Sequence, residues 1–185
     1  KTCYDKDLIY KDYRVTPYCY RCETSLSISD TRESDSTRPK TDPSLVLRFK
    51  TDLNINKLDT YLIAWTTTPW TLPSNLALAV GNEIDYVYIK VENNIYILAE
   101  AALKNQVHIV GENPEIIKKC KGSDLVGLKY EPLFDYFKDI AKERNYYRVI
   151  SADFVDVEEG VGIVHTAPAF GEDDYWVCRK EGIKA

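Results

Sequence analysis

Residues 61–80, YLIAWTTTPWTLPSNLALAV, decide how this chain folds. The apolar run at residues 62–65 is typical of a buried strand, and three threonines follow it at once. Pro69 lacks a backbone donor and favours an extended Thr68, so we expect the strand to end here. Three hydroxyl groups then lie at a strand end, where binding residues are common. Because threonine is also a good strand former, a plain β-edge without chemistry is the alternative interpretation.

Length and composition predict a single globular domain. A chain of 185 residues can bury a sizeable core, and its hydrophobic (44%) and charged (29%) fractions are typical of soluble proteins. No apolar run approaches the roughly 18 residues of a membrane span, and no signal peptide opens the chain, so we expect no membrane partner. The absence of methionine, including at position 1, indicates a segment of a longer protein. A net charge of −5 argues against a dedicated nucleic-acid binder, although contact with one nucleotide end remains compatible with it.

The five cysteines predict a reducing, cytoplasmic setting, because their number is odd and their spacing is not that of a secreted disulfide framework. Cys19 and Cys22 form a CxxC pair that can bind one zinc, but a structural zinc site needs four ligands. The remaining cysteines are isolated, and both histidines lie in strand-like runs. Half of a zinc site, completed by residues elsewhere, is therefore favoured over a complete site. A redox motif is disfavoured because no helical pattern follows Cys22.

The pattern divides the chain into a leading segment, residues 1–44, and a core, residues 45–185. The leading segment contains the CxxC pair and, at residues 23–44, a polar stretch typical of a flexible connection. The core is strand-rich, and Asn93-Asn94 indicates a hairpin. Strands are expected at residues 45–49, 62–65, 86–91, 95–98, 107–110, 116–120, 146–150, 154–157 and 163–166, a short helix at residues 100–104 and a charged loop at residues 138–145.

Residues 158–182, EEGVGIVHTAPAFGEDDYWVCRKEG, form the second informative stretch. His165 follows two apolar residues in a buried strand, a position more typical of a core histidine than of a catalytic one. The acidic residues 172–174 and the basic residues 179–180 match the two ends of a helix dipole, so helix capping is the plain interpretation of the acidic trio. No serine–histidine or cysteine–histidine pair is evident. The residues alone predict a mixed α/β domain with a polar pocket at a strand end.

Two motifs in this order carry a specific resemblance. WTTTPWTLPSN at residues 65–75 and GVGIVHTAPAFGEDDY at residues 160–175 closely resemble the editing domain of isoleucyl-tRNA synthetases, an insertion in the class I catalytic domain. The related valyl and leucyl enzymes carry Thr-Thr-Arg-Pro in the first motif, whereas this chain has Thr68-Pro69-Trp70-Thr71. The CxxC region and residues 42–45 are also similar to the start of that insertion. The ATP-binding signatures of the parent synthetase are absent, so we expect no amino-acid activation.

The resemblance implies a β-rich, mixed α/β fold with a six-stranded, β-barrel-like core and peripheral helices. It implies hydrolysis of valine esterified to the tRNA for isoleucine, after transfer, with editing before transfer as a further option. Isoleucine against valine in this enzyme family is the standard case in which one methylene is worth only about 1–3 kcal/mol, so a second, hydrolytic pocket supplies the remaining accuracy. That pocket must admit the smaller side chain and exclude the larger one with a rigid wall.

The same resemblance implies roles for individual residues. Asp174 would grip the α-ammonium group of the substrate in a charge-assisted hydrogen bond. The hydroxyls of Thr66, Thr67 and Thr68 would bind the ester and terminal ribose and position water. His165 would line the side-chain pocket and help to exclude isoleucine. Catalysis would rest on positioning and polarisation, with assistance from the vicinal ribose hydroxyl as a hypothesis. The other implied substrate-binding residues are Trp65, Asn75 and Ile163.

Partners and cofactors also follow from the resemblance. The expected partners are the valine-bearing 3′ end of the isoleucine tRNA and the rest of the synthetase, with weak tRNA affinity and a monomeric state for the segment alone. Editing needs no cofactor; ATP and Mg²⁺ would serve only the synthetic site of the parent, and Cys19 and Cys22 would be half of a zinc site in the full-length protein. The alternatives are a non-catalytic module that positions or docks the tRNA end and a free-standing editing protein.

Overall fold

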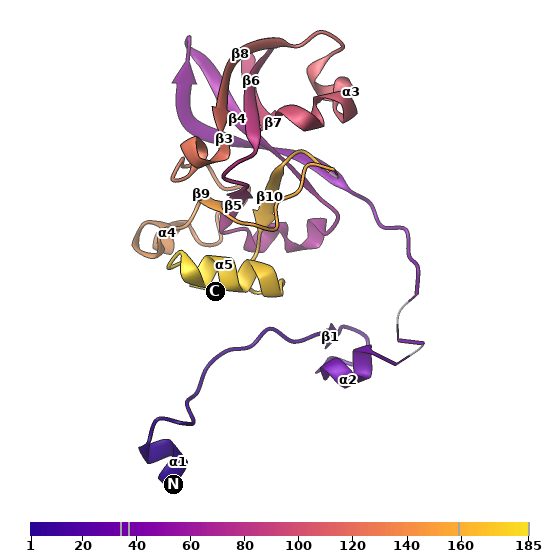
Figure 1. Ribbon diagram of the computed structural model, residues 1–185, viewed down its shortest axis with the longest axis vertical. Helices are drawn as coiled ribbons and strands as arrows, with labels where there is room; N and C mark the ends of the chain where they lie inside the picture. Colours follow the sequence, from indigo (N-terminus) through magenta and orange to yellow (C-terminus); the bar gives the residue numbers. More distant parts are fainter. Residues whose placement is uncertain (34, 37, 159, 185) are drawn as a thin grey trace. The chain divides into compact units, whose positions relative to one another are not determined.

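The computed structural model describes residues 1–33, 35–36, 38–158 and 160–184. By their internal contacts these residues form two compact units, Lys1–Lys40 and Thr41–Ala185 (Figure 1). The two units are described separately. Within the described ranges, no helix is both long and apolar enough to cross a membrane.

The first unit, Lys1–Lys40, contains little regular structure. Helix α1 spans Thr2–Asp5, strands β1 (Tyr18–Cys19) and β2 (Thr24–Ser25) pair antiparallel, and helix α2 spans Ile28–Thr31. Part of the stretch predicted as a flexible connection is thus regular. The reason is local, because the Ser27 and Asp30 side chains form a capping box that satisfies the backbone donors at the start of α2. Neither helix buries a residue.

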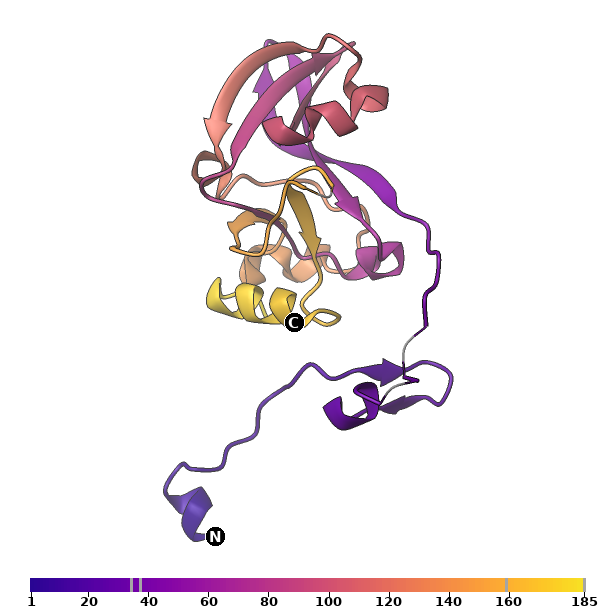
Figure 2. The same cartoon turned by 45° about the vertical axis from the view of Figure 1, so that its right-hand side comes forward.

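The second unit is built on a curled sheet with eight strands in the described part of the chain (Figures 1 and 2). The strand order is β8-β6-β7-β4-β10-β5-β9, and β3 pairs with β4. The prediction of a β-rich, mixed α/β domain is confirmed, with two more strands than the six implied. The strands are β3 (Leu45–Ile55), β4 (Leu58–Thr66), β5 (Ala77–Val80), β6 (Asp85–Val91), β7 (Asn94–Ala99), β8 (Glu115–Lys121), β9 (Arg148–Ser151) and β10 (Ile163–Thr166).

Peripheral helices complete the second unit, as predicted. Helices α4 and α5 lie beside the part of the sheet formed by β5, β9 and β10, while α3 lies beside the other part (Figures 1 and 2). The helical segments are the 3₁₀ helices η1 (Pro69–Ser74), η2 (Glu100–Asn105) and η3 (Gly122–Leu125), and the α-helices α3 (Val107–Val110), α4 (Lys138–Arg144) and α5 (Glu172–Lys180).

Strand β4 is the central strand of the sheet. It pairs with β3 along one edge, and along the other edge its partner changes from β7, beside residues 59–62, to β10, beside Trp65. Leu62 and Ala64 pack in one hydrophobic cluster and Ile63 in a second, so β4 is covered on both faces. A strand covered on both faces needs a continuous apolar run, which explains the sequence of residues 62–65. The threonines follow at the end of β4, where its partner strand has changed from β7 to β10.

The predicted hairpin is confirmed, although its turn lies one residue earlier than expected. Strands β6 and β7 pair with Val91 opposite Asn94, so Glu92 and Asn93 form the turn, and Glu92 adopts a positive φ of 54°. A second hairpin joins β3 and β4 through Asn56 and Lys57, which also have positive φ values of 53° and 64°. Two residues with positive φ are typical of the turn that matches strand twist.

Three predicted segments are wrong. Residues 107–110 form helix α3 and not a strand, because this short apolar run continues from η2 and ends at Gly111 with a φ of 83°. Residues 138–145 form helix α4 and not a loop, since Ala141 packs against the core and Asn145 ends the helix in a left-handed conformation. Residues 154–157 form no strand: the Asp156 carboxylate accepts from the next two backbone N–H groups and turns the chain.

Strand β10 and helix α5 have the predicted positions. Gly162, with a φ of 73°, turns the chain into β10, which pairs antiparallel with β5 and contacts β4 in parallel. Helix α5 has three acidic residues in its first turn and two basic residues in its last, as the helix dipole favours.

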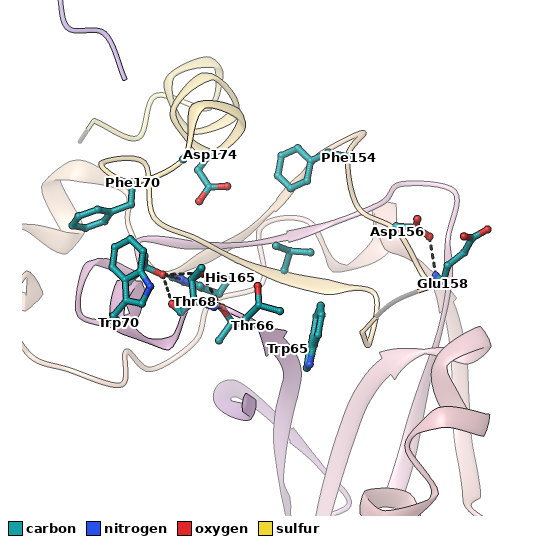
Figure 3. Close-up of a pocket in the computed structure, with 14 residues that line it drawn as sticks. Trp65, Thr66, Thr68, Trp70, Phe154, Asp156, Glu158, His165, Phe170 and Asp174 are labelled. Carbon is teal, nitrogen blue, oxygen red and sulfur yellow. Dashed lines mark hydrogen bonds between the residues drawn. The ribbon is translucent and has the colours of Figure 1, made fainter. Parts of the chain in front are cut away.

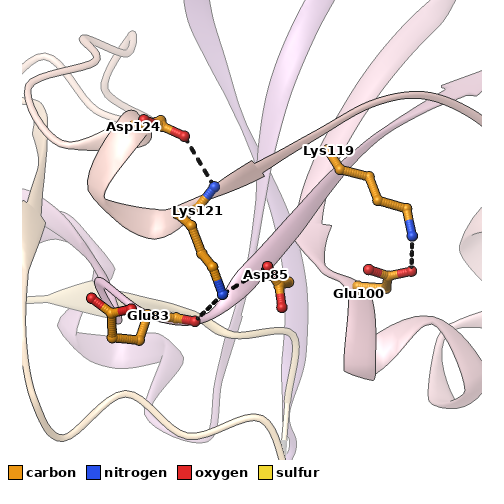
Figure 4. A network of polar contacts seen from close by, with 6 residues as sticks. All are labelled: Glu83, Asp85, Glu100, Lys119, Lys121 and Asp124. Carbon is orange, nitrogen blue, oxygen red and sulfur yellow. Dashed lines mark hydrogen bonds and ion pairs between the residues drawn. The ribbon is translucent and has the colours of Figure 1, made fainter.

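Two of the three lysines of edge strand β8 are paired with acidic groups of neighbouring elements (Figure 4). Lys119 forms an ion pair with Glu100, and Lys121 contacts the Asp85 carboxylate at 2.9 Å and the Glu83 carbonyl at 2.9 Å. Exposed pairs of this kind stabilise a fold by less than about 1 kcal/mol. They do, however, neutralise the positive charge of Lys119 and Lys121.

Candidate functional site

A cavity of about 500 Å³ opens where β4 and β10 end (Figure 3). It combines hydroxyls, one imidazole, three carboxylates and several aromatic rings. The lining residues are Trp65, Thr66, Thr67, Thr68, Trp70, Thr71, Phe154, Asp156, Glu158, Val164, His165, Phe170, Gly171 and Asp174. The volume falls within the range of roughly 300–1,000 Å³ that is usual for small-molecule sites.

The three threonines reach the cavity from the end of β4. Thr66 is its last residue and is buried, whereas Thr67 and Thr68 are exposed beyond it. The Thr68 backbone N–H donates to Thr66 Oγ1 at 3.1 Å, and the two hydroxyl oxygens lie 3.3 Å apart. Pro69 then starts η1, so Thr68 cannot continue the strand. The hydroxyls of Thr66 and Thr68 are therefore held together at the cavity.

His165 is the penultimate residue of β10 and only 6% exposed. Its Nε2 lies 2.7 Å from Thr71 Oγ1, and its Nδ1 lies 3.0 Å from Asn75 Nδ2. Burial lowers the pKa of His165 from 6.5 to about 4. The ring is thus neutral near pH 7, with both nitrogens engaged by neighbours.

Asp174 lies in the first turn of α5 and points toward the cavity (Figure 3). Its Oδ2 accepts from the Ala167 backbone N–H at 2.9 Å. Burial raises the pKa of this carboxyl, and the Ala167 bond opposes the rise. The close approach of the chain depends on Gly171, because a Cβ there would lie 3.0 Å from Asp174 Cγ. The carboxylate is the group at this end of the cavity that can bind a cation.

Aromatic side chains lie at both ends of the cavity. Trp70 and Phe170 form an edge-to-face pair with centroids 5.5 Å apart, and they are 66% and 50% exposed. Trp65 and Phe154 lie at the other end, where Gly160 approaches the indole so closely that a Cβ would be 2.9 Å away. Exposed aromatic faces beside polar groups are typical of sites that stack a base or ring.

Sequence comparisons place the chain among known proteins. No protein-family model matches it. The isoleucine–tRNA ligase of Bdellovibrio bacteriovorus is 47% identical over 182 residues, which cover 97% of this chain and 17% of that protein. The isoleucine–tRNA ligase of Corynebacterium diphtheriae is 43% identical over 199 residues, covering 100% of this chain and 19% of that protein. The chain is a relative of isoleucine–tRNA ligases. It spans less than a fifth of the length of these curated relatives.

Solved structures define the fold of this isoleucine–tRNA ligase relative. The crystal structure of GlLeuRS-CP1 matches with a TM-score of 0.61 at 18% identity, over 77% of this chain and 66% of that chain. The P. knowlesi cytosolic leucyl-tRNA synthetase editing domain matches with a TM-score of 0.59 at 16% identity, over 76% of this chain and 65% of that chain. The chain therefore has the fold of a synthetase editing domain, as its two motifs predict.

In this editing-domain fold, most of the predicted site residues meet at one cavity. They come from two stretches about 100 residues apart, joined by the parallel contact between β4 and β10. The predicted residues that line the cavity are Trp65, Thr66, Thr67, Thr68, His165 and Asp174.

Two of the residues predicted to bind substrate, Asn75 and Ile163, do not line the cavity. Asn75 is 5% exposed and lies behind His165, to which its amide is hydrogen-bonded. Ile163 shares a strand face with His165 but lies two residues deeper, where it is 1% exposed and packs in the core. Its neighbour Val164 lines the cavity instead.

The CxxC pair is close in space but has no further ligand in the described part of the chain. The Cys22 backbone N–H donates to Cys19 Sγ at 3.4 Å, and hydrogen bonds from Cys22 lower the pKa of the Cys19 thiol. Among the described residues, no group of three or more potential metal ligands occurs. The donors present therefore fit at most half of a tetrahedral zinc site.

Several lining residues were not predicted: Trp70, Thr71, Phe154, Asp156, Glu158, Val164, Phe170 and Gly171. Trp70 and Phe170 lie inside the two quoted motifs, so their position beside predicted residues was a usable signal. Phe154 and Asp156 lie in a segment predicted as a strand, and Glu158 follows it; nothing in the pattern indicated that these residues reach the cavity.

Proposed function

We propose that this chain is the editing domain of an isoleucine–tRNA ligase and hydrolyses the ester that joins valine to the tRNA for isoleucine. The observation that supports this proposal best is the convergence of Asp174, His165 and the threonines on one cavity of about 500 Å³. A cation site, a neutral wall and a group of hydroxyls are what recognition of an aminoacyl ester requires.

Asp174 is proposed to bind the α-ammonium group of the substrate. Its carboxylate lies at a helix N-terminus, where the dipole favours the ionised form against the opposing effect of burial. A positively charged ammonium group would favour that ionised form further and form a charge-assisted hydrogen bond. Binding at this point would fix the substrate's α-carbon beside the threonines.

His165 is proposed to form the wall that excludes isoleucine. A wall that separates side chains differing by one methylene must not move, since the difference is worth only about 1–3 kcal/mol. The His165 ring meets this need because it is buried and hydrogen-bonded through both nitrogens. The same bonds, with a pKa of about 4, argue against a role as general base.

The threonine hydroxyls are proposed to bind the ester and position the attacking water. Thr66 and Thr68 lie at the cavity with their hydroxyl oxygens 3.3 Å apart, which suits hydrogen bonds to one small group. Without a strong base at this point, catalysis would come from positioning and polarisation of the ester, assisted by the vicinal ribose hydroxyl.

Trp70 and Phe170 are proposed to stack the terminal adenine. Both rings are exposed at the rim of the cavity, and stacking of a base on an aromatic side chain is worth about 1–3 kcal/mol. The remaining partners in this proposal are the rest of the tRNA and of the synthetase chain, in the cytoplasm. The net charge of −5 and the paired lysines of β8 favour weak tRNA binding by this segment alone.

The deciding experiment measures deacylation of valyl- and isoleucyl-tRNA for isoleucine by the wild-type chain, Asp174→Ala and Asp173→Ala. Asp173 is a suitable control because it is the adjacent, exposed acid of the same helical turn and does not line the cavity. We expect selective loss of valine, abolished by Asp174→Ala and retained by Asp173→Ala. Equal rates for wild type and Asp174→Ala would contradict the role of Asp174.

If the wild-type chain releases neither amino acid, binding of a non-hydrolysable valyl-adenosine analogue separates the two functional classes. Binding that requires Asp174 supports an editing pocket to which the parent enzyme must deliver tRNA. Failure to bind favours the alternative, a module that positions or docks the tRNA end without catalysis.

A further inference from the structure

A chain of buried hydrogen bonds runs from Tyr130 to the cavity wall. The Tyr130 hydroxyl donates to Asn75 Oδ1 at 2.7 Å, and Asn75 Nδ2 lies 3.0 Å from His165 Nδ1. Tyr130 is 5% exposed and Asn75 is also 5% exposed. Tyr130 does not line the cavity, and nothing in the proposed chemistry uses it.

The orientation of the Asn75 amide follows from its neighbours. Asn75 Nδ2 lies 2.8 Å from the carbonyl oxygen of Ala77, which can only accept a hydrogen bond. The opposite orientation would place the Asn75 amide oxygen against the Ala77 carbonyl oxygen, so that neither could donate. The amide therefore has its NH₂ group toward Ala77 and His165 and its oxygen toward Tyr130.

The tautomer of His165 follows in turn. Because an amide NH₂ group only donates, Nδ1 of the neutral ring must accept and its proton must be on Nε2. The Nε2–H then donates to Thr71 Oγ1 at 2.7 Å, and the Thr71 hydroxyl donates to the Thr68 carbonyl at 2.8 Å. Every bond from Tyr130 to Thr68 thus has one consistent direction.

We propose that Tyr130 is a positioning residue: together with the Ala77 carbonyl it fixes the Asn75 amide, which holds His165 in the Nε2–H tautomer and in one ring orientation. Tyr130 can do so because its own ring is fixed, packed edge-to-face against Phe49 at 5.3 Å and Tyr147 at 6.0 Å. Its hydroxyl remains a donor, since burial raises its pKa well above the ordinary value. The consequence for valine selectivity rests on the proposed function of His165 as the excluding wall.

The test compares Tyr130→Phe with Tyr147→Phe. Both changes remove one hydroxyl from the same buried aromatic cluster, but the Tyr147 hydroxyl is bonded to the backbone of Phe137 and not to Asn75. The imidazole nitrogens are observed by ¹⁵N NMR near neutral pH. The chain has two histidines, so exposed His108 serves as an internal reference.

We expect wild type and Tyr147→Phe to show the pure Nε2–H pattern for His165, with a coupling across the hydrogen bond between Asn75 Nδ2 and His165 Nδ1. In Tyr130→Phe the two nitrogen shifts should move toward each other and the coupling should weaken. An Nδ1–H pattern in the wild type, or unchanged shifts in a folded Tyr130→Phe, would overturn the proposal. The wild-type measurement decides the tautomer even if Tyr130→Phe does not fold.

Deacylation rates then test the consequence separately. We expect Tyr130→Phe to lower the preference for valine over isoleucine by roughly two- to tenfold, the effect of one neutral hydrogen bond, with Tyr147→Phe unchanged. A mixed tautomer with unchanged preference would overturn the link to selectivity. A locked tautomer in a chain that neither binds nor hydrolyses the ester would contradict the proposed function and leave the positioning role supported.

Discussion

His165 and Asp174 are opposite cases of burial acting on an ionisable group. Burial disfavours the charged form of each, so it lowers the pKa of the histidine and raises that of the aspartate. Their hydrogen bonds then differ in effect. Asp174 accepts from a backbone N–H at a helix N-terminus, which favours its charged form, whereas the partners of His165 are neutral side chains. Two side chains of one cavity thus differ in charge, which suits the proposed roles of Asp174 as a cation site and His165 as a neutral wall.

The lowered pKa of His165 predicts a pH-dependent loss of stability. Above pH 6.5 the full contribution of His165 to the free energy of unfolding is present. As pH falls below 6.5, the unfolded chain binds the proton before the folded chain does, so this contribution decreases until pH reaches the folded pKa of about 4. The expected loss through this group is roughly 3 kcal/mol. Urea unfolding should show that loss in wild type and in a His108→Gln control. It should be missing in His165→Gln; an equal loss in both variants would contradict the prediction.

Trp70 provides a test of adenine stacking. Replacement by alanine removes an exposed ring at the cavity rim, so we expect KM for valyl-tRNA to rise by roughly 5- to 150-fold with little change in kcat. Trp176→Ala is the control, because this tryptophan is also exposed but does not line the cavity. Steady-state deacylation kinetics check both variants. Similar KM values for the two would show that Trp70 does not bind the base.

Strand β10 is the element that brings the two motifs together. It contacts β4 at Trp65 and pairs with β5 over four residues, so His165 and Asp174 reach the end of the threonine strand. The turn before β10 must be tight, because Gly162 has a φ of 73° and a Cβ there would lie 2.4 Å from Ala99 Cβ. The geometry of the cavity thus depends on a glycine outside it.

Glycine replacements in the second unit test this dependence. Gly127 also has a positive φ of 88°, but a Cβ there meets nothing within 4 Å. We expect Gly127→Ala to cost about 1–2 kcal/mol for the backbone alone. Gly162→Ala should cost roughly 1–3 kcal/mol more from overpacking and should also reduce deacylation. Denaturant unfolding measures the difference; equal losses would show that the Ala99 contact relaxes.

At the scale of the whole molecule, the second unit holds the core and the cavity. Both hydrophobic clusters lie between Phe49 and Ile183, and the helices of the first unit bury no residue. Residues 41–185 should therefore fold alone, with a Tm within about 2 °C of the full chain. Calorimetry of the shortened chain checks this. A large drop in Tm would show that residues 1–40 support the core.

The charge of the molecule predicts weak, salt-sensitive binding of uncharged tRNA. A net charge of −5, with Lys119 and Lys121 of β8 already in ion pairs, leaves little to hold a phosphate backbone. We expect a Kd weaker than about 1 μM near physiological salt, measured by gel shift or fluorescence anisotropy. Nanomolar binding would contradict this prediction and favour a dedicated RNA-binding surface.

The sequence by itself determined the β-rich class, the buried strand at residues 62–65, the presence of a hairpin between β6 and β7, helix α5 and six of the residues that line the cavity. These features depend on local sequence patterns or on long motifs, which can be recognised without knowledge of the tertiary contacts. The sequence misassigned α3 and α4 because short apolar or charged runs suit either structure until packing decides. The sequence did not show that Asn75 and Ile163 lie behind the cavity lining, because that position depends on how the strands and η1 pack.

Only the tertiary structure decided which buried residues support the cavity lining through hydrogen bonds. Tyr130 lies 55 residues from Asn75 in the chain, and His165 lies 90 residues from Asn75, so no local pattern relates them. Their contact exists because β10 pairs with β5 and because Tyr130 bridges to Thr51 of β3 at the same time. A buried hydrogen bond needs its donor and acceptor fixed in direction as well as in distance, and the packed sheet alone supplies that constraint.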